Sequence, residues 1–385
     1  MYDLKTIIGW AKEEEAEIIE NRHFLHMHPE LAFREYETAA FIRKKLNEYG
    51  LSYRSVDTGT IVDIPGGNSP AAAIRADIDA LPIQEPAGFP YASINNNAMH
   101  ACGHDCHAAM LLGCARILNK HRNELPGNIR LIFQPAEEGG GGAQRMIAAG
   151  CLENIKTIYC LHMRSNCEIG HFMTRSGYIH AASDGFIIHV HGKSCHGASP
   201  HSGIDAITIS AHIILALQEI ISREISPYDN AVLTIGKIIG GEARNILCGS
   251  VMMDGTLRTV NEDTRQKICS RMKEVIERTA SVFRGSAELE FVQSYCSCYN
   301  DKTETDYVVR LANDMFGENA VSFVERTSMG GEDFGFYQQQ IPGAKLYIGT
   351  GCTEEIHTPA FRVDERGLFY GTALMTAIAM NRYAN

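Results

Sequence analysis

The sequence predicts an α/β fold in which a small second domain is inserted into a larger one. Predicted strands and helices alternate over residues 71–161, which is typical of a parallel α/β sheet. Residues 186–292 instead follow the order β-α-β-β-α-β, which is the ferredoxin-like arrangement. The first pattern then resumes towards the C-terminus. We therefore expect one domain built from residues 1–180 and 294–385, with residues 181–293 inserted into it.

The larger domain begins with helices and continues with buried strands. Apolar residues from Leu4 to Ile19 recur at helical spacing, and a second helix is expected over 35–49, closed by Gly50. Short apolar runs predict strands at 71–76, 128–133 and 155–161. Apolar residues at helical spacing predict helices between these strands, at 104–119 and 144–149. Because sites in open α/β sheets form outside the carboxyl ends of the strands, the side chains that follow these strands are candidates for a shared site.

The inserted domain and the C-terminal segment complete the pattern. The insertion carries predicted strands at 186–190, 232–239, 251–259 and 287–292 and predicted helices at 204–225 and 264–283. The C-terminal segment carries a helix near 307–315, a strand at 345–348 and a last helix at 365–383. His357 lies between the last strand and the last helix, so it also follows a strand.

Bulk composition excludes several classes of function. The chain of 385 residues has a net charge of -11 and a pI near 5.8, which argues against nucleic acid as a partner because phosphate binding needs clustered Lys and Arg. We expect no secretory signal at the N-terminus, and no apolar stretch approaches the roughly 18 residues that a membrane span needs. The 12 cysteines then indicate reduced thiols in a cytoplasmic protein rather than a disulfide framework.

The stretch MHACGHDCHA, residues 99–108, concentrates side chains that bind metal ions. Cys102 and His104 are separated only by Gly103, which has no side chain to block a shared target. Thiolate, imidazole and carboxylate groups bind borderline divalent cations such as zinc. A run of helix-capping and core residues that happens to include Cys and His is the alternative.

Further candidate ligands follow the predicted strands. Asp77 and Asp79 come after the first strand, the pair Glu137 and Glu138 after the second, and His162 after the third. Each acid taken alone could instead cap a neighbouring helix. Candidate ligands from separate segments exceed the four of a structural zinc site and fit two metal ions that share a bridging water. The five candidates are Cys102, His104, Glu138, His162 and His357. Glu137 is then available as the general base on that water.

Eight motifs, in order from residue 28 to 361, carry a family resemblance. They read HPELAFREYETA, IRADIDALP, HACGHDCHAAML, FQPAEEGGGGAQRMI, CHGASPHSGIDAI, GTLRT, MGGEDF and IHTPAF. Together they resemble the amidohydrolase branch of the di-metal aminoacylase/carboxypeptidase family, which includes hippurate hydrolases, N-acyl-L-amino acid amidohydrolases and indole-acetyl-amino-acid hydrolases. The HACGHD and PAEEG motifs are specific to that branch. The resemblance implies a zinc-peptidase-like mixed sheet flanked by helices, with an inserted ferredoxin-like lid domain used for dimerisation.

The resemblance also implies roles for individual residues of the larger domain. The five candidate ligands are implied to bind two divalent metal ions, Zn²⁺ or Mn²⁺. Glu137 is implied as the general base that takes a proton from the bridging water and later passes it to the leaving amine. Asp79 resembles the acid that orients a ligand histidine.

Three residues of the inserted domain resemble groups that act on the substrate. His196 resembles the histidine that reaches the active site of the partner subunit and stabilises the tetrahedral oxyanion; a surface histidine in a Gly-rich turn is the alternative. Arg258 and Asn245 resemble residues that hold the substrate carboxylate, a task to which the bidentate fork of arginine is suited. A solvated or salt-bridged Arg258 is the alternative at this position.

The segment around His162 departs from the family pattern. Relatives usually have a glycine before this histidine and a proline-containing stretch after it, whereas this chain reads CLHMRSN over 160–166. His162 itself is retained, so metal binding is not threatened. Arg164 is an unusual group beside the metal site, and we expect it to alter the preference for the acyl group or the amino acid.

The function predicted from these observations is hydrolysis of N-acyl amino acids, such as acetyl or benzoyl derivatives, to a carboxylate and a free amino acid. A dipeptidase or metallo-carboxypeptidase with the same mechanism is the alternative, because a dipeptide is also an N-acyl amino acid. A non-catalytic binding protein would not need Glu137 beside the ligands, and a structural zinc protein would hold one metal rather than two. The expected partners are a small-molecule substrate and a second copy of the chain, joined as a homodimer through the lid domain, with no nucleic acid and no membrane.

Overall fold

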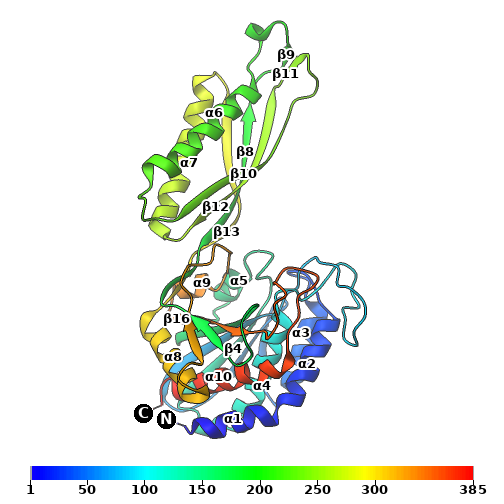
Figure 1. The fold of residues 1–385 in the computed structure, drawn as a ribbon, viewed down its shortest axis with the longest axis vertical. Coiled ribbons are helices and arrows are strands. Elements are labelled where there is room, and N and C mark those ends of the chain that lie inside the picture. The colour runs from blue at the N-terminus through cyan, green and yellow to red at the C-terminus, as the bar shows by residue number, and fades with distance from the viewer. Residues whose placement is uncertain (1, 385) are drawn as a thin grey trace. The chain divides into compact units, whose positions relative to one another are not determined.

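Figure 1 shows the fold of the chain in the computed structural model, which describes residues 2–384. The chain divides into two compact units. The first contains the residues up to Ile179, Tyr299–Arg326 and the residues from Asp333 onward, and the second contains His180–Cys298 and Thr327–Glu332. The second unit is therefore larger than the expected insertion of 181–293, and it includes a segment that we expected in the larger domain.

An eight-stranded mixed sheet lies at the centre of the first unit. In spatial order its strands are β1 Tyr53–Val56, β2 Gly59–Ile64, β4 Gly127–Gln134, β3 Ser69–Asp77, β5 Ile155–Arg164, β16 Gly343–Gly349, β6 Phe172–Thr174 and β15 Val321–Phe323. The strands β4, β3, β5 and β16 run parallel, whereas β1 and β2 form an antiparallel edge beside β4. The predicted mixed α/β class is confirmed, but the sequence analysis did not predict β1, β2, β6 or β15.

Helices flank this sheet. They are α1 Leu4–Glu13, α2 Glu15–Met27, α3 Tyr36–Glu48, α4 His104–Lys120, α5 Gly142–Ala148, α8 Lys302–Phe316, α9 Gly335–Gln338 and α10 Leu368–Asn381, with 3-10 turns at Arg122–Glu124 and Glu365–Gly367. The single opening helix that we predicted is in fact two helices, which meet at Glu14.

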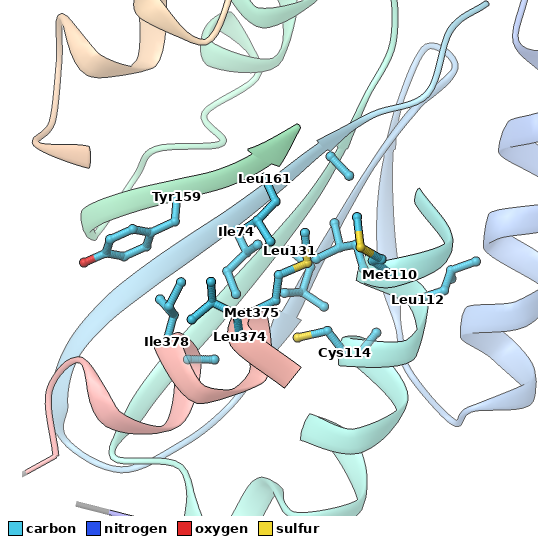
Figure 2. Packing of buried hydrophobic residues seen from close by; sticks show 14 of the residues in the cluster. Ile74, Met110, Leu112, Cys114, Leu131, Tyr159, Leu161, Leu374, Met375 and Ile378 are labelled. Atoms are coloured by element: carbon cyan, nitrogen blue, oxygen red, sulfur yellow. The ribbon is translucent and has the colours of Figure 1, made fainter. Parts of the chain in front are cut away.

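The helix α4 lies in the core and begins within the metal-binding motif, two residues after Cys102. From His104 to Leu118 every residue except Arg116 is buried. Figure 2 shows Met110 of α4 in one group of buried apolar side chains with Ile74 and Leu131 of the strands and Met375 of α10. Because the polar residues of its first turn are also buried, α4 begins in a site shielded from water.

The second unit is a four-stranded antiparallel sheet with two helices. The sheet has the order β10 Ala231–Gly240, β12 Ser250–Thr259, β8 Ala182–His191 and β13 Ser286–Tyr295, and the helices are α6 Ala206–Glu219, continued by a π-helical turn at Ile220–Glu224, and α7 Glu262–Val282. The predicted β-α-β-β-α-β order is confirmed. The boundary predicted at residue 293 is too early, because β13 stays paired with β8 as far as Tyr295.

Short elements complete the two units. The strand β9 Cys195–His196 pairs with β11 Ile246–Leu247, a 3-10 turn lies at Pro200–Ser202, and β7 Gly177–His180 pairs with β14 Cys298–Asn300 where the chain passes between the units.

One helical stretch of the second unit is long and apolar enough to cross a membrane, by length and composition only. This stretch, Ala206–Glu224, has a mean hydropathy of 1.3, so the expectation that none approaches a membrane span is too strict. A single such helix is a weak indication, because core helices share these properties. Here Ile209, Ile213 and Leu217 pack into the core beneath the antiparallel sheet. Only 33% of the stretch is buried, and Ile207 and Leu215 on its other side are 49% and 68% exposed.

A buried network of charges ties the sheet of the first unit to its loops. Arg75 of β3 is 1% exposed, and its guanidinium donates hydrogen bonds to Asp77, to Asp333 at 2.6 Å and to Gln134 at 2.8 Å. Asp333 also accepts hydrogen bonds from the Gln134 side chain at 2.7 Å and from the Ala143 N–H at 3.0 Å. The network therefore fixes the end of β3, from which the candidate site begins.

We expect replacement of Arg75 by Met to destabilise the first unit by about 3–5 kcal/mol, because it leaves the Asp77 and Asp333 carboxylates buried without their cation. Lys302→Met is a matched control: it removes an ion pair with Asp306 in which both side chains are exposed, and it should cost less than about 1 kcal/mol. Denaturant unfolding measures both free energies. Equal costs for the two variants would contradict the structural role given to Arg75.

Candidate metal centre

A tight turn brings Cys102 and His104 close together. Gly103 adopts a φ of 84°, and a Cβ at this position would lie 2.7 Å from Met163 Cγ, so the turn requires glycine. The helix α4 starts directly after it, with His104 as its first residue. Cys102 and His104 are both buried, so their donor atoms face the interior rather than solvent.

The five predicted ligands converge in the first unit. The Cys102 Sγ lies 3.5 Å from His162 Nε2 and 3.3 Å from His357 Nε2. The His357 Nε2 also lies 3.0 Å from a carboxylate oxygen of Glu138. Cys102, His104 and His162 have donor atoms within 4.8 Å of one another, and so do Cys102, Glu138 and His357. The structure thus brings the five candidate ligands together from four separate segments of the chain.

Hydrogen bonds fix the tautomers of two of these histidines. The His104 Nδ1–H donates to Asp79 at 3.2 Å, and the His162 Nδ1–H donates to the Met163 carbonyl at 2.8 Å. In the neutral form of each ring Nε2 is therefore the nitrogen without a proton, which is the atom that binds a metal ion. The carboxylate and the carbonyl also hold each ring in one orientation.

His107, by contrast, has no nitrogen left for a metal ion. Its Nε2 accepts the Met163 N–H at 2.8 Å, so its proton is on Nδ1, which donates to Asp77 at 2.5 Å. Burial of the ring is the main reason why the pKa of His107 lies below its usual value. The lowered pKa agrees with a neutral imidazole. His107 therefore supports the site by joining β3 to β5.

Asp79 holds both halves of the site in place. One of its carboxylate oxygens accepts the His104 Nδ1–H and the Glu137 N–H at 3.0 Å, and the other accepts the Glu138 N–H at 2.9 Å. A single buried carboxylate thus orients a ligand imidazole and fixes the backbone of the two glutamates. The role predicted for Asp79 matches these contacts, which extend further than the sequence indicated.

Glu35 is a supporting residue that the sequence analysis missed. Its carboxylate is buried and accepts hydrogen bonds from the Ala136 N–H at 2.9 Å and the Thr58 hydroxyl at 2.7 Å. Ala136 has a φ of 53°, a left-handed conformation that is uncommon for a residue with a Cβ. Glu35 therefore stabilises the strained turn that aims Glu137 and Glu138 into the site.

A second buried network that we did not predict lies behind the metal-binding loop. His26 Nδ1 lies 2.7 Å from the Asp105 carboxylate, and Arg22 Nε donates to the same oxygen at 2.8 Å. The opposite nitrogen of His26 lies 3.0 Å from Glu85. Burial and the charge of Arg22 oppose protonation of His26, but Asp105 and Glu85 outweigh them and raise its pKa. The network anchors Asp105, which directly follows a candidate ligand.

The electrostatics of the cluster favour positive charge. Burial, followed by the Glu138 and Glu137 carboxylates, holds the pKa of the Cys102 thiol well above its usual range. Burial opposes protonation of His104, but Asp77 and Asp79 outweigh it and hold the pKa of this imidazole well above its ordinary value. The acids of the site therefore stabilise a cation placed among them.

The residues fit divalent metal ions. The His104 Nε2 is buried and finds no hydrogen-bond partner within residues 2–384, and it lies 3.8 Å from a carboxylate oxygen of Asp77. Leaving such an atom without a partner is costly unless a ligand satisfies it. Thiolate, imidazole and carboxylate are also the donors that zinc and similar ions prefer.

The three residues predicted in the lid lie in the second unit and are divided between its two ends. His196 and Asn245 are neighbours, because the Gly197 N–H donates to the Asn245 carbonyl at 2.8 Å. His196 Nδ1 accepts the Ala198 N–H at 3.1 Å, so the exposed ring carries its proton on Nε2. Arg258 lies eight residues beyond Ser250 on β12, roughly 26 Å along the strand from the end that leads to His196.

Arg258 is half-buried and bonds to neutral acceptors. Its Nε donates to the Met329 carbonyl at 3.1 Å, and its Nη1 donates to the Leu257 carbonyl at 3.2 Å and to the Thr256 hydroxyl. These contacts differ from the salt-bridged alternative and hold the guanidinium in place without neutralising it.

Comparison with known proteins agrees with this architecture. The family model of "Peptidase family M20/M25/M40" matches residues 73–381. An N-acetyl-L-cysteine deacetylase of Bacillus subtilis is 39% identical over 92% of this chain and 85% of its own length, and an IAA-amino acid hydrolase of Arabidopsis thaliana is 38% identical over 93% and 84%. A solved structure of a dinuclear metal-binding peptidase of the M20 family from Bacillus subtilis has a TM-score of 0.84 and 36% identity, covering 97% of this chain and 99% of that one.

The match extends over most of the chain and includes the segments that supply every candidate ligand. The relatives named above act on amide-linked amino acid derivatives by their names, and one solved relative binds two metal ions. The chain therefore belongs to the M20 peptidase family, in its amidohydrolase branch, and is a metallo-hydrolase that acts on amide bonds.

Proposed function

We propose that this protein hydrolyses N-acyl amino acids to a carboxylate and a free amino acid, using two divalent metal ions. The observation that carries the proposal is the position of Glu137. Its carboxylate, the Glu138 carboxylate and the His104 ring have donor atoms that lie within 4.8 Å of one another. A protein that only bound metal would have no use for an additional acid beside a complete set of ligands. The names of the deacetylase and IAA-amino acid hydrolase relatives support the substrate class.

The metal ions would be held by Cys102, His104, Glu138, His162 and His357. When bound, divalent ions lower the pKa of water and polarise the carbonyl of the amide. These five ligands are compatible with both Zn²⁺ and Mn²⁺. The thiol of Cys102 favours Zn²⁺, and the carboxylate of Glu138 suits both ions.

Glu137 has the position and charge of a general base. Its backbone is fixed by Asp79, and its side chain is buried, so its carboxylate has little freedom to leave the site. It takes the proton from the attacking water and passes it to the nitrogen of the leaving amine. Asp79 acts through the residues it holds and is therefore a positioning residue.

The lid residues fit roles in substrate binding. The exposed Nε2–H of His196 is a donor suited to an oxyanion, and the unneutralised guanidinium of Arg258 is suited to a carboxylate. Asn245, beside His196, adds an amide donor. Because the two ends of one lid sheet are far apart, we propose that a second copy of the chain supplies His196 to each site.

A peptidase that cleaves dipeptides is the second candidate, because the solved relative is described as a peptidase. A substrate panel separates the two. Release of amino acid from N-acetyl, N-benzoyl and indole-acetyl amino acids and from dipeptides would be measured with Zn²⁺, Mn²⁺ or EDTA. Metal-dependent cleavage of acyl amino acids in preference to dipeptides supports our proposal, and the reverse preference supports the peptidase.

We also propose that the protein is located in the cytoplasm.

Replacement of Glu137 by Gln should lower kcat by about 10²–10⁴-fold, because the general base is lost. The bound metal should stay the same, because the five ligands are untouched; elemental analysis of the purified variant measures it. Glu318→Gln, at an exposed glutamate, is the control and should retain full activity. Normal turnover by the Glu137 variant would refute its role.

Replacement of Asp79 by Asn should weaken metal binding by about 10–100-fold. The asparagine side chain replaces one acceptor oxygen with an NH₂ donor, whereas three N–H groups need acceptors at this position. Hydrogen bonds that orient His104 and the turn of Glu137 are therefore lost. Competition with a chromophoric chelator measures the affinity, with exposed Asp314→Asn as control. Equal affinities in the two variants would show that Asp79 does not orient the site.

The proposed dimer should depend on the edge strand β10. Ile238 and Ile239 on this strand are 53% and 52% exposed, and an edge strand with free backbone groups is a template for pairing with another chain. We expect the double variant Ile238→Lys/Ile239→Lys to sediment as a monomer and the wild type as a dimer. Val282→Lys, at another exposed apolar residue of the second unit, should leave the dimer intact. A monomeric wild type would contradict both the dimer and the role of His196.

A further inference from the structure

Arg164 places a positive charge beside the candidate metal ligands. It is the last residue of β5 and lies two positions after His162, so the two side chains point to the same face of the sheet. His162 is buried, whereas Arg164 is exposed. Within residues 2–384, the Arg164 guanidinium makes no ion pair and no side-chain hydrogen bond.

The ring of Tyr347 lies near both Arg164 and His162. The guanidinium carbon of Arg164 lies 5.3 Å from the centroid of the Tyr347 ring, a cation–π contact. Tyr347 stands opposite His162 in the parallel pairing of β5 and β16, and the centroids of these two rings are 6.2 Å apart, nearly edge to face. The aromatic contact restrains the arginine next to the site while leaving its N–H groups available.

The backbone that carries Arg164 is also held firmly. Its carbonyl accepts the Thr350 N–H at 3.0 Å, and the Ser165 hydroxyl donates to the Glu354 carbonyl at 2.6 Å. The next side chain, Asn166, donates to the Glu355 carboxylate at 2.6 Å. These bonds join the end of β5 to the segment that leads to His357. The cation is therefore pre-organised relative to two candidate ligands, which lowers the entropic cost of binding an anion.

We propose that Arg164 binds a second carboxylate of the substrate, one additional to the α-carboxylate, and that acidic N-acyl amino acids are therefore preferred. This inference rests on the proposed function. The guanidinium fork matches a carboxylate, and its only ring contact leaves the planar edge free for two hydrogen bonds. The carboxylate can end the acyl chain, as in an N-succinyl group, or it can be the side chain of an acidic amino acid.

Two substrate pairs distinguish these sources. The ratio of kcat/KM for N-succinyl-leucine to that for N-acetyl-leucine reports a carboxylate on the acyl chain, and the ratio for N-acetyl-glutamate to N-acetyl-glutamine reports one on the amino acid. We expect one of the two ratios to fall about tenfold or more in Arg164→Ala, to recover in part in Arg164→Lys, and to reverse in Arg164→Glu. Arg122→Ala, at another exposed arginine of the first unit, should leave both ratios at the wild-type value.

Other outcomes separate this inference from the proposed function. If Arg164→Ala slows all four substrates equally, or changes none of them, Arg164 does not select charge and the inference is wrong, although the hydrolase stands. If the wild type cleaves no substrate, the proposed function fails. Calorimetric titration of the metal-loaded wild type and Arg164→Ala with N-succinyl-leucine and N-acetyl-leucine then still tests the inference, because equal binding of both ligands to the wild type would overturn it.

Discussion

The candidate site depends on the buried Asp79 carboxylate, which accepts three N–H groups from two different parts of the chain. One part is the helix that begins with His104, and the other is the turn that carries the proposed base and a proposed ligand. Neither part could hold its geometry alone, because the turn passes through the left-handed conformation of Ala136. The carboxylate joins them, and Glu35 supports the same turn from the other side.

Around this centre the protein combines charges that are individually costly to bury. Arg75 neutralises Asp77 and Asp333, while Arg22 and His26 neutralise Asp105. Burial favours the protonated form of an acid, and a neighbouring cation or several N–H donors counter this effect. The cations therefore keep these supporting acids ionised, so that Asp77 and Asp105 can hold the rings of His107 and His26 behind the candidate ligands.

Much of the architecture follows from local sequence patterns. Apolar runs predicted the parallel strands β3, β4, β5 and β16, and because such strands end at one edge of a sheet, the side chains after them were expected to meet. The ferredoxin-like order of the second unit was likewise visible in alternating segments. The edge strand β1 was missed because its four residues are partly or fully exposed and carry little periodic signal. The neighbouring strand β2 is mostly buried, but its six residues are a short run that Asp63 interrupts. The break of the first helix at Glu14 also has no strong signal, because neither glycine nor proline marks it.

Apart from Asp79, the supporting residues were not predicted, because their roles depend on partners far away in the chain. His26 contacts Asp105, 79 residues later, and Arg75 contacts Asp333, 258 residues later. Nothing near Glu35 in the sequence indicates that it anchors Ala136. His107 lies in the metal-binding motif itself, and only its contacts with Asp77 and Met163 show that both of its nitrogens are used.

Anomalous X-ray diffraction from crystals grown with Zn²⁺ or Mn²⁺ tests the central claim most directly. The account predicts two anomalous peaks in each chain, both within the cluster formed by Cys102, His104, Glu138, His162 and His357, with the Glu137 carboxylate beside them. A single peak would contradict the proposed pair of metal ions. A peak bound by His107 would contradict the hydrogen bonds that make this histidine a structural residue.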